Sequence, residues 1–337
     1  MMDLPKLIVL DVAHGNCSIL QDTEGSIIID CAHGDTLIET LKHLKIKEID
    51  RIMISHANQY HFKGFVDLLS DETIIVKQVH LNPDAKKDTH VLKALRLAIN
   101  DAKKRNKTSH EYLDTDMTGK LDVGEVRIEV LAPSKEIMGY SGSKDLQGKS
   151  LTSNSVSAVV RLVYKSRGVV LLAGDIDQVG LDNLLRNSSE IRADVLIFPH
   201  HGGNTGVGKE KENQEFTVKL CQQVKPKLTL FSIGRDKHQN PRKEVVKTIL
   251  DTLPDVHILC TQLSKHCSST IISIDPSHLN TFPSKGREAN HCCGGTVVIN
   301  FNKTEITYAP SDDHRQFVKY NVPSALCGGA IFLRKID

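Results

Sequence analysis

The sequence contains no tryptophan, and aromatic residues make up only 4% of its 337 positions. This scarcity argues against a surface of stacked rings for single-stranded nucleic acid. The formal net charge is +2, so bulk electrostatics favour no particular class of partner. No run of about 18–20 apolar residues occurs, which predicts that the chain has no membrane partner.

The amino terminus also lacks the features of an export signal. Residues Met1–Lys6 lead directly into an apolar stretch, so we expect a cytoplasmic protein. The eight cysteines are then expected to be thiols or metal ligands rather than disulfides. A composition of 39% hydrophobic and 25% charged residues is typical of a globular domain with a large core.

Apolar stretches alternate with helical patterns along the chain. Strands are predicted over residues 6–12, 16–20, 26–30, 51–54, 74–81, 125–131, 156–164, 168–173, 194–198, 228–233 and 256–260. Helices are predicted over residues 36–46, 62–69, 84–107, 178–187 and 242–252, and residues 134–154 are expected to form a loop. Such alternation indicates an α/β layered architecture.

Residues 55–61, SHANQYH, carry the most informative motif. They follow the apolar strand at 51–54 and precede the helical run at 62–69. Two histidines, His56 and His61, flank neutral residues where a metal-binding motif would carry further ligands. The segment therefore looks like a metal motif that has lost its acids.

Further motifs follow in a fixed order. They are Asp11–Asn16, Asn154–Ser157, Gly174–Ile176, Pro199–Gly202, and Ser232–Gly234 with Pro241. Together with the histidine motif they resemble the metallo-β-lactamase superfamily, in the branch of bacterial DNA-uptake (competence) channel proteins. The resemblance covers about residues 6–260. It implies a four-layer αβ/βα sandwich, which we assign to residues 1–301.

That family holds one or two metals, usually Zn²⁺ or Mn²⁺, for hydrolysis. The resemblance implies metal ligands at His56, His61 and Asp175, with His200 or His201 as the last ligand. Three ligand positions are degenerate. Asn58 and Tyr60 replace ligands of the histidine motif, and Asn240 stands where the family has a His-Pro step.

Charge decides what such a pocket can hold. Two divalent cations at about 3.5–4 Å need several anionic ligands, and only Asp175 is secure here. We therefore expect no dimetal centre. One Zn²⁺ or Mn²⁺ bound by His61, Asp175 and His201 is one alternative, and a metal-free scaffold is an equal one.

A second constellation lies near the carboxyl terminus. Its members are Cys260, His266, Cys267, His291, Cys292 and Cys293. Thiolates and imidazoles can build a structural zinc site, which would pin an insertion at about residues 260–293. Buried free cysteines and a disulfide are the alternatives. Residues 302–337 are expected to form a polar tail that ends in an apolar strand, Ala330–Leu333.

These observations predict a non-catalytic or single-metal component of a multiprotein system, such as a DNA-processing or defence assembly, with protein partners. A metal-dependent phosphodiesterase acting on nucleic acid or nucleotides is the enzyme alternative, by family analogy. A DNA-binding subunit without chemistry is a third hypothesis. It depends on the basic helix at 84–107, where Lys103, Lys104 and Arg105 would contact phosphates, although a solvated helix face is the favoured explanation of these charges.

Overall fold

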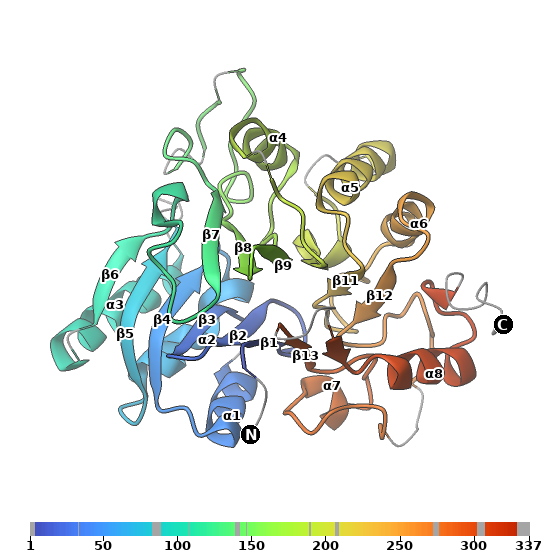
Figure 1. Ribbon diagram of the computed structural model, residues 1–337, viewed down its shortest axis with the longest axis horizontal. Coiled ribbons are helices and arrows are strands. Elements are labelled where there is room, and N and C mark those ends of the chain that lie inside the picture. Colours follow the sequence, from blue (N-terminus) through green and yellow to red (C-terminus); the bar gives the residue numbers. More distant parts are fainter. Residues whose placement is uncertain are drawn as a thin grey trace.

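Hydrophobic strands in the amino-terminal half assemble into one large mixed sheet. The computed structural model describes residues 4–32, 34–82, 89–106, 108–138, 142–145, 147–188, 190–205, 209–271, 276–301 and 307–328. Within them, the first sheet has the strand order β14-β13-β1-β2-β3-β4-β5-β6 (Figure 1). Its strands are β1 (Lys6–Val9), β2 (Cys17–Gln21), β3 (Ser26–Cys31), β4 (Glu48–Ile54), β5 (Ile75–Leu81), β6 (Ser109–Tyr112), β13 (Val297–Asn300) and β14 (Thr307–Ala309).

The second sheet comes from the middle of the chain. Among the described residues its strand order is β12-β11-β10-β9-β8-β7. Its strands are β7 (Arg127–Ala132), β8 (Val159–Tyr164), β9 (Arg167–Leu172), β10 (Val195–Ile197), β11 (Leu228–Phe231) and β12 (His257–Cys260). Strands β9 to β12 run parallel, so their carboxyl ends meet at one edge.

Apolar side chains on the inner faces of both sheets form a shared core, which contains Leu7, Val9, Val170 and Leu230. Helices cover the outer faces (Figure 1). On the first sheet these are α1 (Gly34–Leu44), α2 (Gln59–Ser70) and α3 (His90–Asn106). On the second they are α4 (Gln178–Asn187), α5 (Glu210–Val224), α6 (Lys243–Thr252) and α8 (Asp312–Asn321). The arrangement is the expected four-layer sandwich of helix, sheet, sheet and helix.

Several elements differ from the prediction. Helix α3 begins at His90, and residues 83–88 lie outside the described part of the chain. Helix α5 and the edge strand β6 were not predicted. Helix α5 is rich in charged and amide residues, so its buried stripe around Phe216 and Leu220 is weak in the sequence.

Part of the segment expected as a polar tail belongs to the sandwich. Strand β14 pairs antiparallel with β13, and Phe317 and Val318 of α8 pack into the core beside the second sheet. The predicted apolar strand at Ala330–Leu333 lies outside the described residues. Between β12 and β13, the insertion contributes one short helix, α7 (Lys285–Glu288), among the residues that the structure describes. Within those same ranges, no helix combines the length and the apolar character needed to cross a bilayer.

Candidate metal centre

The histidine motif lies where β4 ends and α2 begins, at the edge where the two sheets meet. Both His56 and His61 are completely buried. Asn58 caps α2, because its side-chain oxygen accepts a hydrogen bond from the Tyr60 amide at 3.3 Å. The cap fixes the turn that brings both imidazoles to one side.

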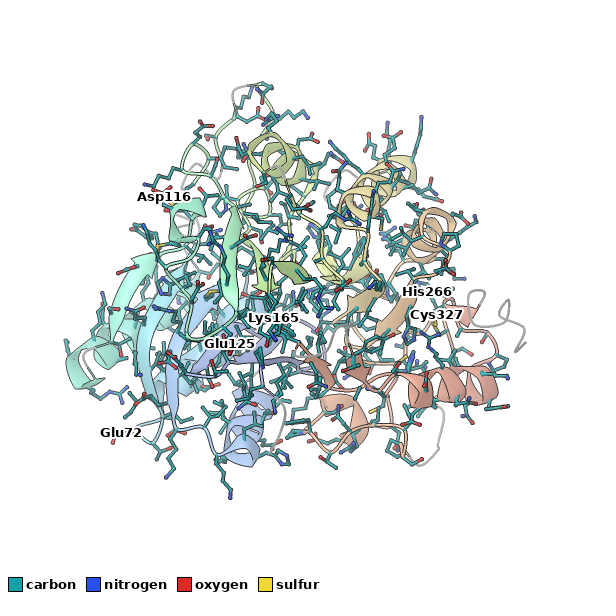
Figure 2. The ribbon with its side chains drawn as sticks, in the orientation of Figure 1. Glu72, Asp116, Glu125, Lys165, His266 and Cys327 are labelled. Atoms are coloured by element: carbon teal, nitrogen blue, oxygen red, sulfur yellow. The ribbon has the colours of Figure 1, made fainter. Side chains whose placement is uncertain are left out.

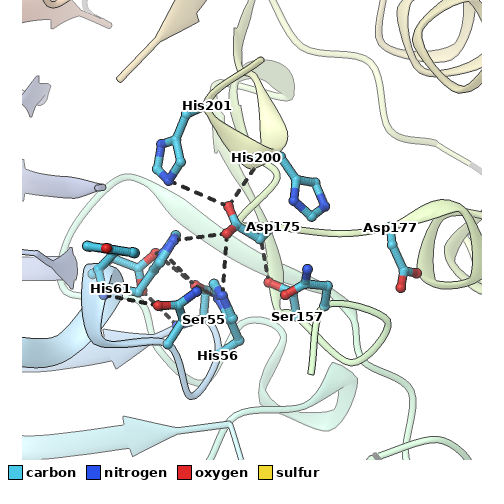
Figure 3. A network of polar contacts seen from close by, with 12 residues as sticks. Ser55, His56, His61, Ser157, Asp175, Asp177, His200 and His201 are labelled. Carbon is cyan, nitrogen blue, oxygen red and sulfur yellow. Dashed lines mark hydrogen bonds and ion pairs between the residues drawn. The ribbon is translucent and has the colours of Figure 1, made fainter. Parts of the chain in front are cut away.

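Asp175 comes from the opposite sheet, three residues after the end of β9 and directly after Gly174. Gly174 adopts φ 55°, and a Cβ there would lie 2.4 Å from Ser157 Oγ, so the turn requires glycine. The Asp175 amide donates to Ser157 Oγ at 3.0 Å. This contact aims the carboxylate across the gap between the sheets, towards the two imidazoles (Figure 3).

Three ligand atoms converge there. Within the described ranges, one group of at least three His, Cys, Asp or Glu side chains has its ligand atoms within 4.8 Å of one another, and it consists of His56, His61 and Asp175. The Nε2 atoms of His56 and His61 lie 3.5 and 3.3 Å from Asp175 Oδ2, yet neither makes a hydrogen bond. Buried ring nitrogens without hydrogen bonds are costly, and a cation between the two rings and the Asp175 carboxylate would bind both nitrogens.

The adjacent histidines His200 and His201 contact Asp175 in different ways, one through its main chain and the other through its ring. His200 and His201 both adopt positive φ, 52° and 56°, which is costly for a residue other than glycine. The His201 ring faces Asp175, with its Nε2 at 4.0 Å from Oδ1, whereas the His200 ring points away (Figure 3). His200 contributes its amide, which donates to Asp175 Oδ1 at 3.2 Å. His201 Nδ1 donates to the Ser232 carbonyl at 2.8 Å, so its Nε2 is the free ligand atom.

Asp30 is a site residue that the sequence reading did not single out. It is the last residue but one of β3, which runs parallel to β4, and is 3% exposed. Its Oδ2 accepts from His61 Nδ1 at 2.7 Å, and its two oxygens also accept from the Ser55 amide and hydroxyl, each at 2.8 Å. A carboxylate on the far nitrogen fixes the tautomer and orientation of a metal-binding histidine. The sequence did carry a signal for this residue, because an ionisable Asp30 directly follows the apolar run Ile27–Ile29.

The electrostatics of the site are dominated by His61. Burial alone lowers the pKa of an imidazole, but Asp175 and Asp30 on either side raise the pKa of His61 to about 10. Burial lowers the pKa of His56 and also that of His201, the latter to about 4. Burial would raise the pKa of Asp175, but His61 and His56 hold it well below its usual value.

The degenerate positions do not supply anionic ligands. The Asn58 oxygen is engaged in the helix cap, and the Tyr60 ring packs edge-on against His14 at 4.8 Å between centroids. Asn240 hydrogen bonds through Nδ2 to the His200 carbonyl at 3.4 Å. Asp175 is therefore the one carboxylate in the converged group.

Above the site, His14 forms a cluster of rings that the sequence did not indicate. Its ring centroid lies 4.5 Å from that of His201 and 4.7 Å from that of His238. Burial, together with these neighbouring imidazoles, lowers the pKa of His14 to about 3. The His14 ring is thus neutral at neutral pH and adds no charge to the pocket.

The structure does not bring the six residues of the second predicted constellation together. Cys292 Sγ lies 3.9 Å from Ser284 Oγ, and His291 Nδ1 faces Asp236 at 3.7 Å. His266 is partly exposed at the surface (Figure 2). Cys260, Cys267 and Cys293 do share one buried cluster.

The predicted nucleic-acid contacts lie at the carboxyl end of α3, on the outer layer of the first sheet. Lys103 and Lys104 are exposed. The Arg105 guanidinium instead donates to the Leu69 carbonyl at 2.6 Å and ties α3 to α2.

Comparison with known families agrees with this geometry. A family model described as the metallo-beta-lactamase superfamily matches residues 10–229, more than half of the chain. The chain therefore belongs to the metallo-β-lactamase superfamily. Among individual proteins, ComE operon protein 3 of Bacillus subtilis (strain 168) is 24% identical over 221 residues. The match covers 63% of this chain and 24% of that protein, so the chain spans about a quarter of its length.

Solved structures give weaker likenesses. The metallo-beta-lactamase fold protein YhfI from Bacillus subtilis has a TM-score of 0.48 and 12% identity, over 76% of this chain and 97% of its own. The short form of human tRNase Z has a TM-score of 0.40 and 13% identity, over 68% and 93%. At such scores neither likeness carries an argument about function.

Proposed function

We propose that this chain binds one divalent transition metal, Zn²⁺ or Mn²⁺, through His56, His61 and Asp175, with His201 beside them. It works as a single-metal component of a multiprotein DNA-processing or defence system. The observation that carries the proposal is the convergence of three buried ligand atoms, two of them ring nitrogens without hydrogen-bond partners. The resemblance of the motifs to the DNA-uptake branch of the superfamily supports a place in DNA processing.

Charge supports one ion rather than two. A second cation close to the first would need further carboxylates, but Asn58 caps a helix and Tyr60 packs against His14. Oxygen and nitrogen ligands suit Mn²⁺ as well as Zn²⁺. The Asp30 carboxylate also supports binding of an ion. It hydrogen bonds to His61 Nδ1, which leaves His61 Nε2 facing the point where His56 and Asp175 converge.

Titration of the chelator-treated protein with Mn²⁺ tests the proposal. We expect one tightly bound Mn²⁺ per chain, lost in His61→Ala and retained in His90→Ala, which alters an exposed histidine at the start of α3. Mn²⁺ is suitable because thiolates elsewhere in the chain do not favour it. Two bound ions, or binding that survives His61→Ala, would contradict the proposal.

Metal-dependent hydrolysis is the second candidate, because three protein ligands leave room for a water at the ion. A metal bound there would lower the pKa of that water to about 7. The chain's own part is to hold His61 through Asp30 and to place His201 beside Asp175. The assay is Mn²⁺-dependent cleavage of single- and double-stranded DNA and of bis(p-nitrophenyl) phosphate.

The outcomes of this assay separate the candidates. Cleavage by the unmodified chain that disappears in His61→Ala establishes the hydrolase. No cleavage by the unmodified chain, together with cleavage by the double variant Asn58→Asp/Tyr60→Asp, favours the non-catalytic role. In that case the substitutions would have restored the missing anionic ligands.

A nucleic-acid contact on α3 is proposed separately, on the exposure of Lys103 and Lys104. Charge reversal of both residues should weaken binding of a labelled duplex, measured by fluorescence anisotropy at low salt. Reversal of Lys211 and Lys219 on α5 is the control. Equal affinity in all three proteins would eliminate this contact.

A further inference from the structure

Four cysteines from distant parts of the sequence meet at the carboxyl-terminal end of the second sheet. Cys260 ends β12, Cys267 lies in the following loop, Cys293 precedes β13, and Cys327 follows α8. The first three are 6–8% exposed and belong to one apolar cluster, against which Cys327 packs. All are free thiols.

Main-chain contacts fix this meeting. The amides of Cys293 and Gly294 donate to the carbonyls of Thr261 and Cys260, at 3.3 and 2.7 Å, which holds the two strand ends together. Ser324 Oγ donates to the Cys267 carbonyl at 2.6 Å. The Leu326 amide donates to Cys267 Sγ at 3.5 Å, so the segment that carries Cys327 is docked on the Cys267 loop.

A chain of buried hydrogen bonds ends on one of these thiols. His314 of α8 is completely buried, and its Nε2 lies 3.1 Å from Cys293 Sγ. Its Nδ1 lies 3.2 Å from His257 Nε2, and His257 Nδ1 contacts the Tyr308 hydroxyl. If Tyr308 donates first, each member donates to the next and the His314 N–H is aimed at the sulfur. Such an oriented N–H is the support that metal-bound ligands receive from the residues around them.

One neighbouring cation favours negative charge on sulfur, because the charge of Arg235 acts to lower the pKa of the Cys267 thiol. The Arg235 guanidinium wraps the Cys267 loop, donating to the carbonyls of Leu263 and Ser268, each at 2.8 Å. Burial raises the pKa of Cys260, Cys267 and Cys293, and raises that of Cys327 to about 12, so without a cation all four remain protonated. A divalent cation would displace these protons.

We propose that Cys260, Cys267, Cys293 and Cys327 form a structural zinc site, with His314 donating a hydrogen bond to the Cys293 sulfur. Four sulfur ligands select Zn²⁺ among common divalent ions. Binding breaks four S–H bonds, forms four Zn–S bonds and releases four protons to solvent. Among the described side chains these sulfurs do not all lie within 4.8 Å of one another, so the proposal requires that binding of the ion rotates them together about their Cα–Cβ bonds.

This assignment differs from the set expected from the sequence. Three of its members were in that set, but Cys327 lies 34 residues beyond Cys293 in the sequence. A zinc ion bound by these four cysteines would stabilise the fold, because it would link α8 and the segment after it to the ends of β12 and β13. The site is independent of the proposed centre at His61.

Zinc analysis of the full chain after dialysis against EDTA is the main experiment. The His61→Ala variant isolates the sulfur site by removing the other centre. In that background we expect one retained zinc per chain, lost in Cys267→Ala and in Cys327→Ala. The matched control is Cys221→Ala, a buried cysteine of α5, which should keep the ion. Zinc-free His61→Ala protein, or zinc retained in Cys327→Ala, would overturn the site.

A second measurement needs no cysteine variant. Co²⁺ added to the acid-stripped and refolded unmodified chain should give an intense near-ultraviolet sulfur-to-cobalt charge-transfer band. The centre at His56, His61 and Asp175 contains no sulfur and cannot give one. Absence of the band overturns the zinc site while leaving the proposed function untouched.

Discussion

At the scale of single residues, Asp30 shows how a buried carboxylate can organise a pocket without occupying it. It accepts three hydrogen bonds, from His61 Nδ1, the Ser55 hydroxyl and the Ser55 amide. These contacts determine which nitrogen of His61 faces Asp175. The His61 imidazole is therefore held facing Asp175 although positions 58 and 60 of the same motif carry the neutral side chains of Asn58 and Tyr60.

Asp30→Asn is expected to weaken Mn²⁺ binding by about 10–100-fold, because the amide cannot supply the negative charge that supports the His61 ligand. Calorimetric titration of the chelator-treated protein measures the change. Asp122→Asn is the control, since its carboxylate also accepts a main-chain hydrogen bond, from Ile128 at 2.7 Å, on the separate strand β7. Equal loss in both variants would mean that the effect is general destabilisation.

At the scale of elements, the sequence predicted the sheets better than their connections. Runs such as Ser26–Asp30 and Arg51–Ile54 lie in the strands found, because buried parallel strands are continuously apolar. Helix α5 was missed because charged residues mask its apolar stripe. The histidines that lie beside Asp175 could be named from the sequence, whereas Asp30 could not, since its partner His61 lies 31 residues away and only tertiary packing joins them.

The insertion between β12 and β13 is anchored by another buried carboxylate, Asp11, at the end of β1. It accepts hydrogen bonds from Ser284 Oγ at 2.6 Å, the Gly286 amide at 2.7 Å and Gln262 Nε2 at 2.9 Å. The Asp11 side chain thus holds the start of α7 and the Gln262 side chain at one point.

Asp11→Ala should lower the free energy of unfolding by about 3 kcal/mol, because it leaves three buried donors without an acceptor. Urea denaturation measures the loss, and hydrogen exchange at residues 284–286 should accelerate. Asp145→Ala, which removes the acceptor of a surface turn, should cost well under about 1 kcal/mol. A neutral result for Asp11→Ala would show that α7 is held by other contacts.

At the scale of the whole molecule, buried neutral histidines outnumber the charged one. Burial lowers the pKa values of His14 and His257 to about 3, and those of His80 and His201 to about 4. His61 is the opposite case, with its pKa raised to about 10. The metal-free protein should therefore respond to acid and to base through different groups.

The signs follow from proton linkage. Between pH about 6.5 and 4, these histidines bind protons in the unfolded chain but stay neutral in the folded protein. The free energy of unfolding therefore falls as pH falls. His61 is protonated in both states there. Its contribution, fully present below pH about 6.5, is lost only as pH rises towards 10. Acid sensitivity should consequently begin near pH 6.5, well above the range in which carboxylates titrate.

His80 allows a direct test, because neither of its ring nitrogens has a hydrogen-bond partner and the residue is 1% exposed. Each such imidazole contributes a slope of about 1.4 kcal/mol per pH unit. His80→Met, of similar volume and without a charge, should lower the acid slope of the unfolding free energy by that amount and leave stability at pH 8 equal or higher. His90→Met, at an exposed position, should leave the slope unchanged. Urea denaturation of the chelator-treated proteins from pH 4.5 to 8 measures these slopes. Parallel curves of unfolding free energy against pH for His80→Met and the unmodified chain would show that His80 is protonated equally in the folded and unfolded states.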